Sequence, residues 1–135
     1  MGLFRPMINF VENAEPFTIG DIAVERLAVE HSFPCCGYLL TAPSGRRLAY
    51  ISDCHVLPEQ TLAKLANVDV LVLNCLRERP HPTHLSLSES LSYIERIAPR
   101  RAYLVHMCHD ISHADLAAKL PSGVSPAYDG LELDA

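Results

Sequence analysis

The chain has 135 residues, of which 49% are hydrophobic and 20% charged, and its formal charge is −5 at neutral pH. This length suits one domain or part of one, the composition excludes a disordered tail, and the acidic balance argues against a nucleic-acid partner. No apolar run approaches the ~20 residues of a membrane span and the N-terminus lacks a signal-peptide core, so we expect a cytoplasmic protein that is not membrane-bound.

Residues 1–15 form an apolar arm without a clear secondary-structure pattern. The β-favouring run 22–29 predicts a strand. Two further strands at 36–41 and 47–52 flank a Pro-Ser-Gly turn and are typical of a β-hairpin.

The rest of the chain alternates between helical and strand patterns, which indicates α/β layering. Strands are predicted at 70–74 and 102–105, each within a short apolar run. Apolar residues at helical spacing predict three helices, at 58–66, from Ser86 or Ser88 to about Ile97, and at 113–120. A final hairpin is expected between 124–128 and 131–133, around Asp129-Gly130.

Polar side chains follow several of these strands. His31 comes after the strand at 22–29, Asp53 after the hairpin, His84 closes a proline-stiffened loop, and His106 ends the strand at 102–105. Imidazoles and carboxylates are the usual ligands of zinc, manganese and iron, and strand ends of an α/β sheet meet at one edge. Taken singly, each residue also has an ordinary explanation as a turn, cap or loop residue.

An ordered series of segments carries a family likeness, and it covers most of the chain. The segments are Phe17-Thr18-Ile19-Gly20, Val29-Glu30-His31, Gly37-Tyr38, Leu48-Ala49-Tyr50-Ile51-Ser52-Asp53, Asp69-Val70-Leu71-Val72-Leu73, His81-Pro82-Thr83-His84-Leu85-Ser86, Ala102-Tyr103-Leu104-Val105-His106 and Ala127-Tyr128-Asp129-Gly130-Leu131-Glu132-Leu133. Residues 16–135 thereby resemble the C-terminal half of a metallo-β-lactamase-fold hydrolase, nearest to the PhnP-like phosphodiesterases. The resemblance implies half of an αββα sandwich, with a mixed β-sheet and about three helices.

The resemblance also implies roles for the strand-end residues. His31 would bind one metal ion, His106 a second, and Asp53 would bridge them, with zinc or manganese as the cofactor. His84 would act as acid catalyst or phosphate contact. The implied activity is hydrolysis of a small phosphodiester or cyclic phosphate by metal-activated hydroxide. The resemblance assigns no role to His109 and Asp110, which lie close to His106 in the sequence and could orient a ligand or face the substrate.

The sequence departs from the family at one decisive place, because the His-x-His-x-Asp-His signature of the N-terminal half is absent. The chain would therefore be a fragment, a half completed by another polypeptide, or a degenerate relative. Half a sandwich would expose a sheet face, so we expect an N-terminal half or a homo-oligomer as partner, and very weak or no activity from the isolated chain.

Two alternatives to an enzyme stay open. The first is a non-catalytic module that binds a metal ion or phosphate. The second is a structural zinc site built from Cys35, Cys36, Cys54 or Cys108. Adjacent cysteines such as Cys35 and Cys36 cannot easily both reach one ion, which argues against this site. The odd number of cysteines and the absence of Cys-x-x-Cys spacing favour reduced thiols over a disulfide framework.

Overall fold

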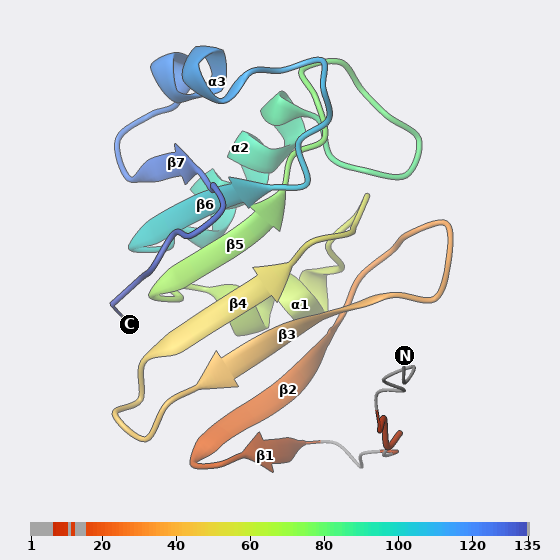
Figure 1. The fold of residues 1–135 in the computed structure, drawn as a ribbon, viewed down its shortest axis with the longest axis vertical. Helices are drawn as coiled ribbons and strands as arrows, with labels where there is room; N and C mark the ends of the chain where they lie inside the picture. The colour runs from red at the N-terminus through yellow and green to blue at the C-terminus, as the bar shows by residue number, and fades with distance from the viewer. Residues whose placement is uncertain (1–6, 11, 13–15, 135) are drawn as a thin grey trace, which may run out of the picture.

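A single mixed β-sheet organises the chain, and three helices accompany it (Figure 1). The computed structural model describes residues 7–10, 12 and 16–134. The strands are β1 (Phe17–Ile19), β2 (Ile22–Ala28), β3 (Cys36–Thr41), β4 (Arg47–Ile51), β5 (Val70–Asn74), β6 (Arg101–Val105) and β7 (Val124–Pro126). The helices are α1 (Glu59–Leu65), α2 (Leu87–Ile97) and α3 (His113–Lys119). The predicted α/β class, with a mixed sheet and three helices, is confirmed.

The sheet keeps the order of the sequence, β1 to β7, but changes character at β4. The pairs from β1 to β4 are antiparallel, and those from β4 to β7 are parallel. Strand β2 therefore runs in the same direction as β4, β5 and β6. The ends of these four strands meet at one edge of the sheet.

The predicted C-terminal hairpin is wrong. Strand β7 pairs in parallel with β6, through Ala102↔Val124 and Leu104↔Pro126, and residues 131–134 form no strand. The crossover through α3 brings β7 back to the sheet, where its partner is β6 and not the segment 131–133. The predicted arm at 1–15 lies largely outside the described residues, which include only 7–10 and 12 of it.

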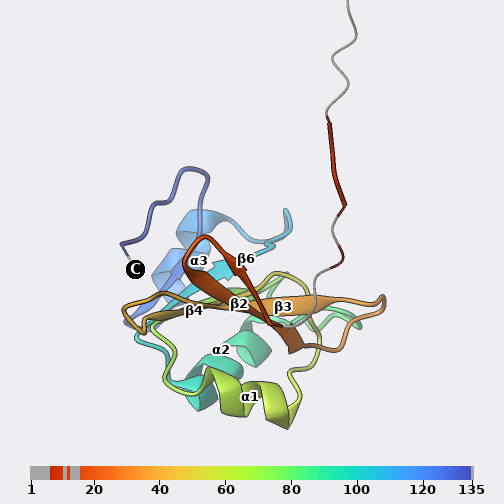
Figure 2. The same cartoon turned by 90° about the horizontal axis from the view of Figure 1, so that it is seen from below.

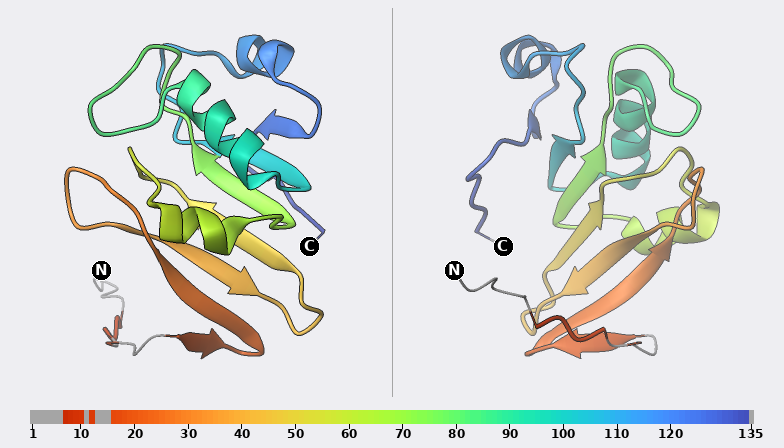
Figure 3. Two further views of the ribbon diagram at one scale, coloured as in Figure 1. Left: turned by 180° about the vertical axis from the view of Figure 1, so that it is seen from behind. Right: turned by 45° about the vertical axis from the view of Figure 1, so that its right-hand side comes forward.

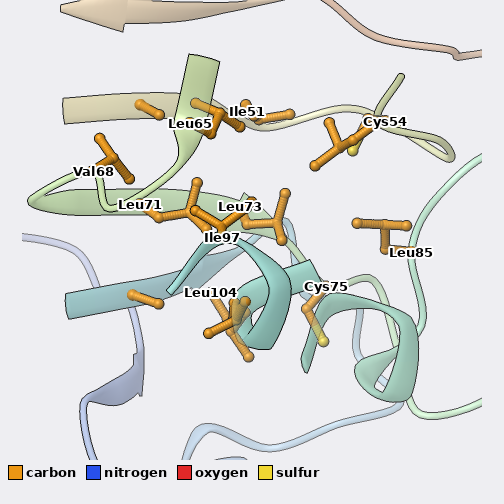
Figure 4. Packing of buried hydrophobic residues seen from close by; sticks show 14 of the residues in the cluster. Ile51, Cys54, Leu65, Val68, Leu71, Leu73, Cys75, Leu85, Ile97 and Leu104 are labelled. Atoms are coloured by element: carbon orange, nitrogen blue, oxygen red, sulfur yellow. The ribbon is translucent and has the colours of Figure 1, made fainter. Parts of the chain in front are cut away.

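Helices α1 and α2 cover one face of the sheet, and the core lies beneath them (Figures 2 and 3). Ile51, Leu71, Leu73 and Leu104 project from neighbouring strands into this layer and are fully buried (Figure 4). Gly37 lies on the same face, where an added Cβ would lie 2.8 Å from Ile51 Cγ1. Glycine at this position lets β3 and β4 pack tightly.

The opposite face is apolar and open over β1–β4. A hollow of about 550 Å³ lies on it, and the exposed fractions of Ile19, Tyr38 and Tyr50 are 65%, 38% and 45%. Its full lining is Phe17, Ile19, Val24, Tyr38, Leu40, Leu48 and Tyr50. No helix of the described residues covers this part of the sheet (Figure 2), and an apolar face of this kind is what half a sandwich would expose.

Helix α2 has specific signals at both ends. Ser86 and Glu89 form a reciprocal capping box at its start, as expected for a Ser-x-x-Glu sequence. At its end Ala98 adopts a left-handed conformation with φ of 53°, which normally suits glycine. Among the described residues, no helix combines the length and the apolar character needed to cross a membrane.

Replacing Ala98 with glycine should raise the free energy of unfolding by about 1 kcal/mol, because an L-residue in the left-handed region is strained by about that amount. Urea unfolding would measure the change. Ala63 provides the matched control, since it lies exposed within α1. There the same substitution should lower stability by about 1 kcal/mol. If both substitutions changed the free energy of unfolding in the same direction, the expectation would be contradicted.

Candidate metal site

The ends of β2, β4, β5 and β6 lie along one edge of the sheet (Figure 1). Four side chains from separate segments meet there. His31 lies in the loop after β2, and Asp53 lies two residues beyond β4. His84 belongs to the loop between β5 and α2, and His106 directly follows β6. All four residues singled out from the sequence are thus brought together.

The Nε2 atom of His84 lies at the centre of this cluster. It is 3.3 Å from His31 Nε2, 3.1 Å from His106 Nε2 and 3.4 Å from Asp53 Oδ1. His106 Nε2 is also 3.1 Å from Asp53 Oδ1. The ligand atoms of His31, Asp53 and His84 all lie within 4.8 Å of one another, a grouping that could hold a metal ion. Imidazole nitrogen and carboxylate oxygen are donors that zinc and manganese take, so the donor chemistry suits the metal that the resemblance implies.

Asp53 is held as a carboxylate. Ser52 Oγ donates a hydrogen bond of 2.7 Å to Oδ2, which leaves Oδ1 facing the histidines. This hydrogen bond, with the adjacent His106 and His84, lowers the pKa of Asp53 despite partial burial. The side chain therefore presents a negative charge at neutral pH, as a metal ligand requires.

The side chain of His84 is more buried than those of its neighbours Asp53 and His106. It is 14% exposed, against 36% for Asp53 and 42% for His106. Burial lowers the pKa of His84, although Asp53 opposes the shift. The neutral imidazole is therefore favoured in this chain more than in a free histidine. Its role as acid catalyst stays a prediction.

The backbone at His106 is unusual, because φ is 62°. Left-handed non-glycine residues are strained and cluster at functional sites. Hydrogen bonds on both sides hold the segment: Cys75 N donates to Val105 O and Cys108 N donates to Leu76 O, each at 2.9 Å. The strand end is thus fixed where His106 meets the cluster.

Asn74 is a supporting residue that the sequence analysis missed. Its side chain is fully buried, and Nδ2 donates a 3.0 Å hydrogen bond to Cys54 O while Cys54 Sγ donates to Oδ1 at 3.0 Å. Ser90 Oγ also donates to the Asn74 carbonyl. The amide thereby ties the end of β5 to the loop that carries Asp53. The sequence did contain a signal for this role, because an asparagine stands at the end of a buried apolar strand.

His109 and Asp110 lie beside the site without joining it. The His109 side chain is 96% exposed and contacts Asp110, whose carboxylate pairs with Arg79 at 3.1 Å. No interaction among the described residues connects either side chain with the four clustered residues. A role for this pair toward substrate stays a prediction.

The cysteines do not assemble a site of their own. All five are free, and the metal-binding group found among the described residues contains His31, Asp53 and His84 but no cysteine. Cys54 and Cys75 are buried. The alternative of a structural zinc site built from cysteines therefore finds no support.

Thiol labelling tests this arrangement. Burial raises the pKa of Cys54 to about 12 and that of Cys75 to about 11, so their thiolate fractions at pH 8 are very small. We expect iodoacetamide to modify Cys35 in the folded protein and to leave Cys54 and Cys75 unmodified until urea unfolds the chain. Peptide mass spectrometry would show the order, and early modification of Cys54 would contradict it.

Three imidazoles and a carboxylate at one edge of an α/β sheet indicate a metal-binding protein. The family comparison makes this specific, because residues 5–107 match the model of the beta-lactamase superfamily domain. The chain therefore belongs to the beta-lactamase superfamily and has the metallo-β-lactamase-type fold. None of the curated protein sequences matches it significantly.

Solved structures agree with this assignment. A diphosphatase from the PhnP family is 30% identical, with a TM-score of 0.83 over 92% of this chain and 47% of that one. Zn(2+)-bound PqqB from Methylobacterium extorquens is 23% identical, with a TM-score of 0.69 over 93% of this chain and 51% of that one.

Human tRNase Z, short form, is 15% identical, with a TM-score of 0.65 over 85% of this chain and 44% of that one. The present chain therefore spans about half the length of the structures it resembles. The resemblance to the PhnP-like group is confirmed, and the relatives include hydrolases.

Proposed function

We propose that this chain contributes one half of the active centre of a metal-dependent hydrolase that cleaves small phosphodiesters or related phosphoric acid derivatives. The convergence of His31, Asp53, His84 and His106 at one sheet edge carries the proposal. The 30% identity to a PhnP-family diphosphatase supports the substrate class. The five free thiols support a reducing, cytoplasmic compartment.

Each side chain has a task that follows from its chemistry. His31 and His106 would bind one divalent ion each, and the anionic Asp53 would lie between the two cations and reduce their repulsion. Bound zinc or manganese supplies Lewis-acid activation of water at neutral pH. His84 Nε2 would deliver a proton to the departing oxygen as a general acid.

The proposal includes a second polypeptide segment that completes the centre. The chain spans 47% of the related diphosphatase, and the sequence lacks the His-x-His-x-Asp-His signature. The apolar face over β1–β4 offers a surface for a covering layer, which the corresponding N-terminal half would provide. We therefore expect the isolated chain to be inactive.

A fusion experiment tests the proposal. The N-terminal half of the related diphosphatase would be joined to this chain, and the folded fusion loaded with Mn²⁺ or Zn²⁺ would be assayed with bis(p-nitrophenyl) phosphate and with a diphosphate. We expect metal-dependent hydrolysis by the fusion, none by the isolated chain, and loss of activity in the D53N fusion.

The controls separate misfolding from a wrong proposal. Circular dichroism and metal analysis would first establish a folded fusion with two bound ions. Such a fusion without turnover would contradict the hydrolase and favour the alternative of a non-catalytic metal-binding module. Turnover that survives D53N would show that the activity arises elsewhere.

A further inference from the structure

A group of arginines lies at the edge of the sheet opposite the candidate metal site. Strands β4, β5 and β6 run in parallel, so their starts share the edge away from the clustered histidines (Figure 1). Arg46 and Arg47 stand at the start of β4, and Arg100 and Arg101 at the start of β6. Four of the 11 lysine and arginine residues of an acidic chain are thus gathered at one edge.

Two of these arginines already have partners. The Arg47 guanidinium donates to Lys64 O at 3.0 Å and to Ala66 O at 2.8 Å, which ties β4 to the end of α1. Arg100 pairs with Asp69 Oδ1 at 3.5 Å. The other carboxylate oxygen, Asp69 Oδ2, accepts from the Arg47 backbone N–H at 2.9 Å. Both carboxylate oxygens of Asp69 are therefore occupied.

The remaining two arginines, Arg46 and Arg101, have free guanidinium groups beside a small hollow. Among the described residues, neither guanidinium forms an ion pair or a hydrogen bond. The hollow has a volume of about 50 Å³ and is lined by Arg46, Asp69, Val70, Arg100, Arg101 and Asp134. Three guanidinium groups face two carboxylates there, and one of the carboxylates is already paired. The hollow therefore has an excess of positive charge that would attract an anion.

A second, apolar hollow adjoins the first. It has a volume of about 150 Å³ and shares Arg46 and Asp69 with the arginine-lined hollow. Its apolar lining is Ile22, Leu40, Ala42 and Leu48. The two hollows thus form one site with a cationic part and an apolar part. Small-molecule sites commonly combine an apolar lining with a few polar groups that fix the orientation of the ligand.

We propose that the two hollows together bind a phosphate monoester that carries an apolar group. Such a phosphate has about two negative charges and three terminal oxygens, which match three guanidinium groups better than the single charge of a carboxylate does. The apolar group would lie against Leu40 and Leu48, where it leaves water. The site uses none of the residues of the proposed hydrolase and goes beyond that function.

Titration of the purified chain with phenyl phosphate at low ionic strength tests the inference. A chelator would be present, so that no metal ion binds the phosphate. Backbone amide chemical shifts would locate the ligand and give its dissociation constant. We expect shifts at the amides of 44–48, 69–70 and 100–101. Binding should be at least about 10-fold tighter than that of inorganic phosphate, because only the ester fills the apolar hollow.

Two substitutions test the arginines. Arg46→Ala and Arg101→Ala should each weaken binding of phenyl phosphate about 10-fold, because each removes a charge-assisted hydrogen bond to the phosphate. Both side chains are exposed and unpaired, so the fold should persist, and circular dichroism would verify this. Arg96→Ala is the matched control, because this exposed arginine pairs with Glu59 and lines neither hollow. Its affinity should equal that of the wild type.

Several results would overturn the inference. One is the absence of shifts at these amides at millimolar phenyl phosphate, and another is unchanged affinity in Arg46→Ala and Arg101→Ala. Equal affinities for phenyl phosphate and inorganic phosphate would remove the apolar part of the site. An equal loss of affinity in Arg96→Ala would show attraction by surface charge alone. The fusion assay decides the proposed hydrolase separately in every case.

Discussion

Replacing Asp53 with asparagine should lower the zinc affinity of the chain at least 100-fold. The carboxylate is the only anionic group in the cluster, and its replacement leaves neutral imidazoles and a weaker amide oxygen. Loss of a partner that only orients a ligand already lowers metal affinity by about 10–100-fold, so loss of a ligand charge should cost at least as much. Competition with a chromophoric chelator would measure the affinity.

Asp110 provides the matched control for this substitution. It also carries a partly exposed carboxylate next to a histidine, but it pairs with Arg79 instead of joining the cluster. Asp110→Asn should leave zinc affinity unchanged. Equal affinities in the two variants would place the ion elsewhere.

Replacing Asn74 with alanine should lower the free energy of unfolding by about 2–4 kcal/mol. The substitution leaves Cys54 O without its partner, and an unsatisfied buried polar group costs about 1–3 kcal/mol. The cavity left by the side chain adds to that cost. Urea unfolding would measure the loss. Gln60→Ala removes an amide from an exposed position of α1 and should change stability by less than about 0.5 kcal/mol.

Asn74→Ala should also affect the metal site, because the amide anchors the loop that carries Asp53. We expect zinc affinity to fall about 10-fold in the variant at a temperature where it remains folded. Wild-type affinity together with the full stability loss would limit Asn74 to a structural role. A stability loss no greater than that of Gln60→Ala would contradict the anchoring described above.

Local sequence patterns were sufficient to predict most of the elements. The run at 70–73 is apolar throughout because β5 is buried on both faces, and Ser86 was one of the two serines expected to start α2. The C-terminal segment could not be predicted in the same way. Its turn residues suggested a hairpin, but β7 pairs with β6 after the crossover through α3, and 131–134 form no strand.

Only part of the site could be predicted from the sequence. His31, Asp53 and His106 each follow a strand, so the arrangement of strands predicted their convergence. The central place of His84 Nε2 depends on the packing of the 77–84 loop, which no local pattern encodes. The contact between Asn74 and Cys54 joins residues 20 positions apart and likewise requires the three-dimensional structure.

Anomalous X-ray diffraction at the zinc edge, from crystals of this chain grown with Zn²⁺, would test the central claim most directly. The account predicts zinc in the cluster, about 2.0–2.1 Å from a carboxylate oxygen of Asp53 and from an imidazole nitrogen of His31 or His106. A peak bound to the cysteines, or no peak near Asp53 in a fully loaded crystal, would contradict it.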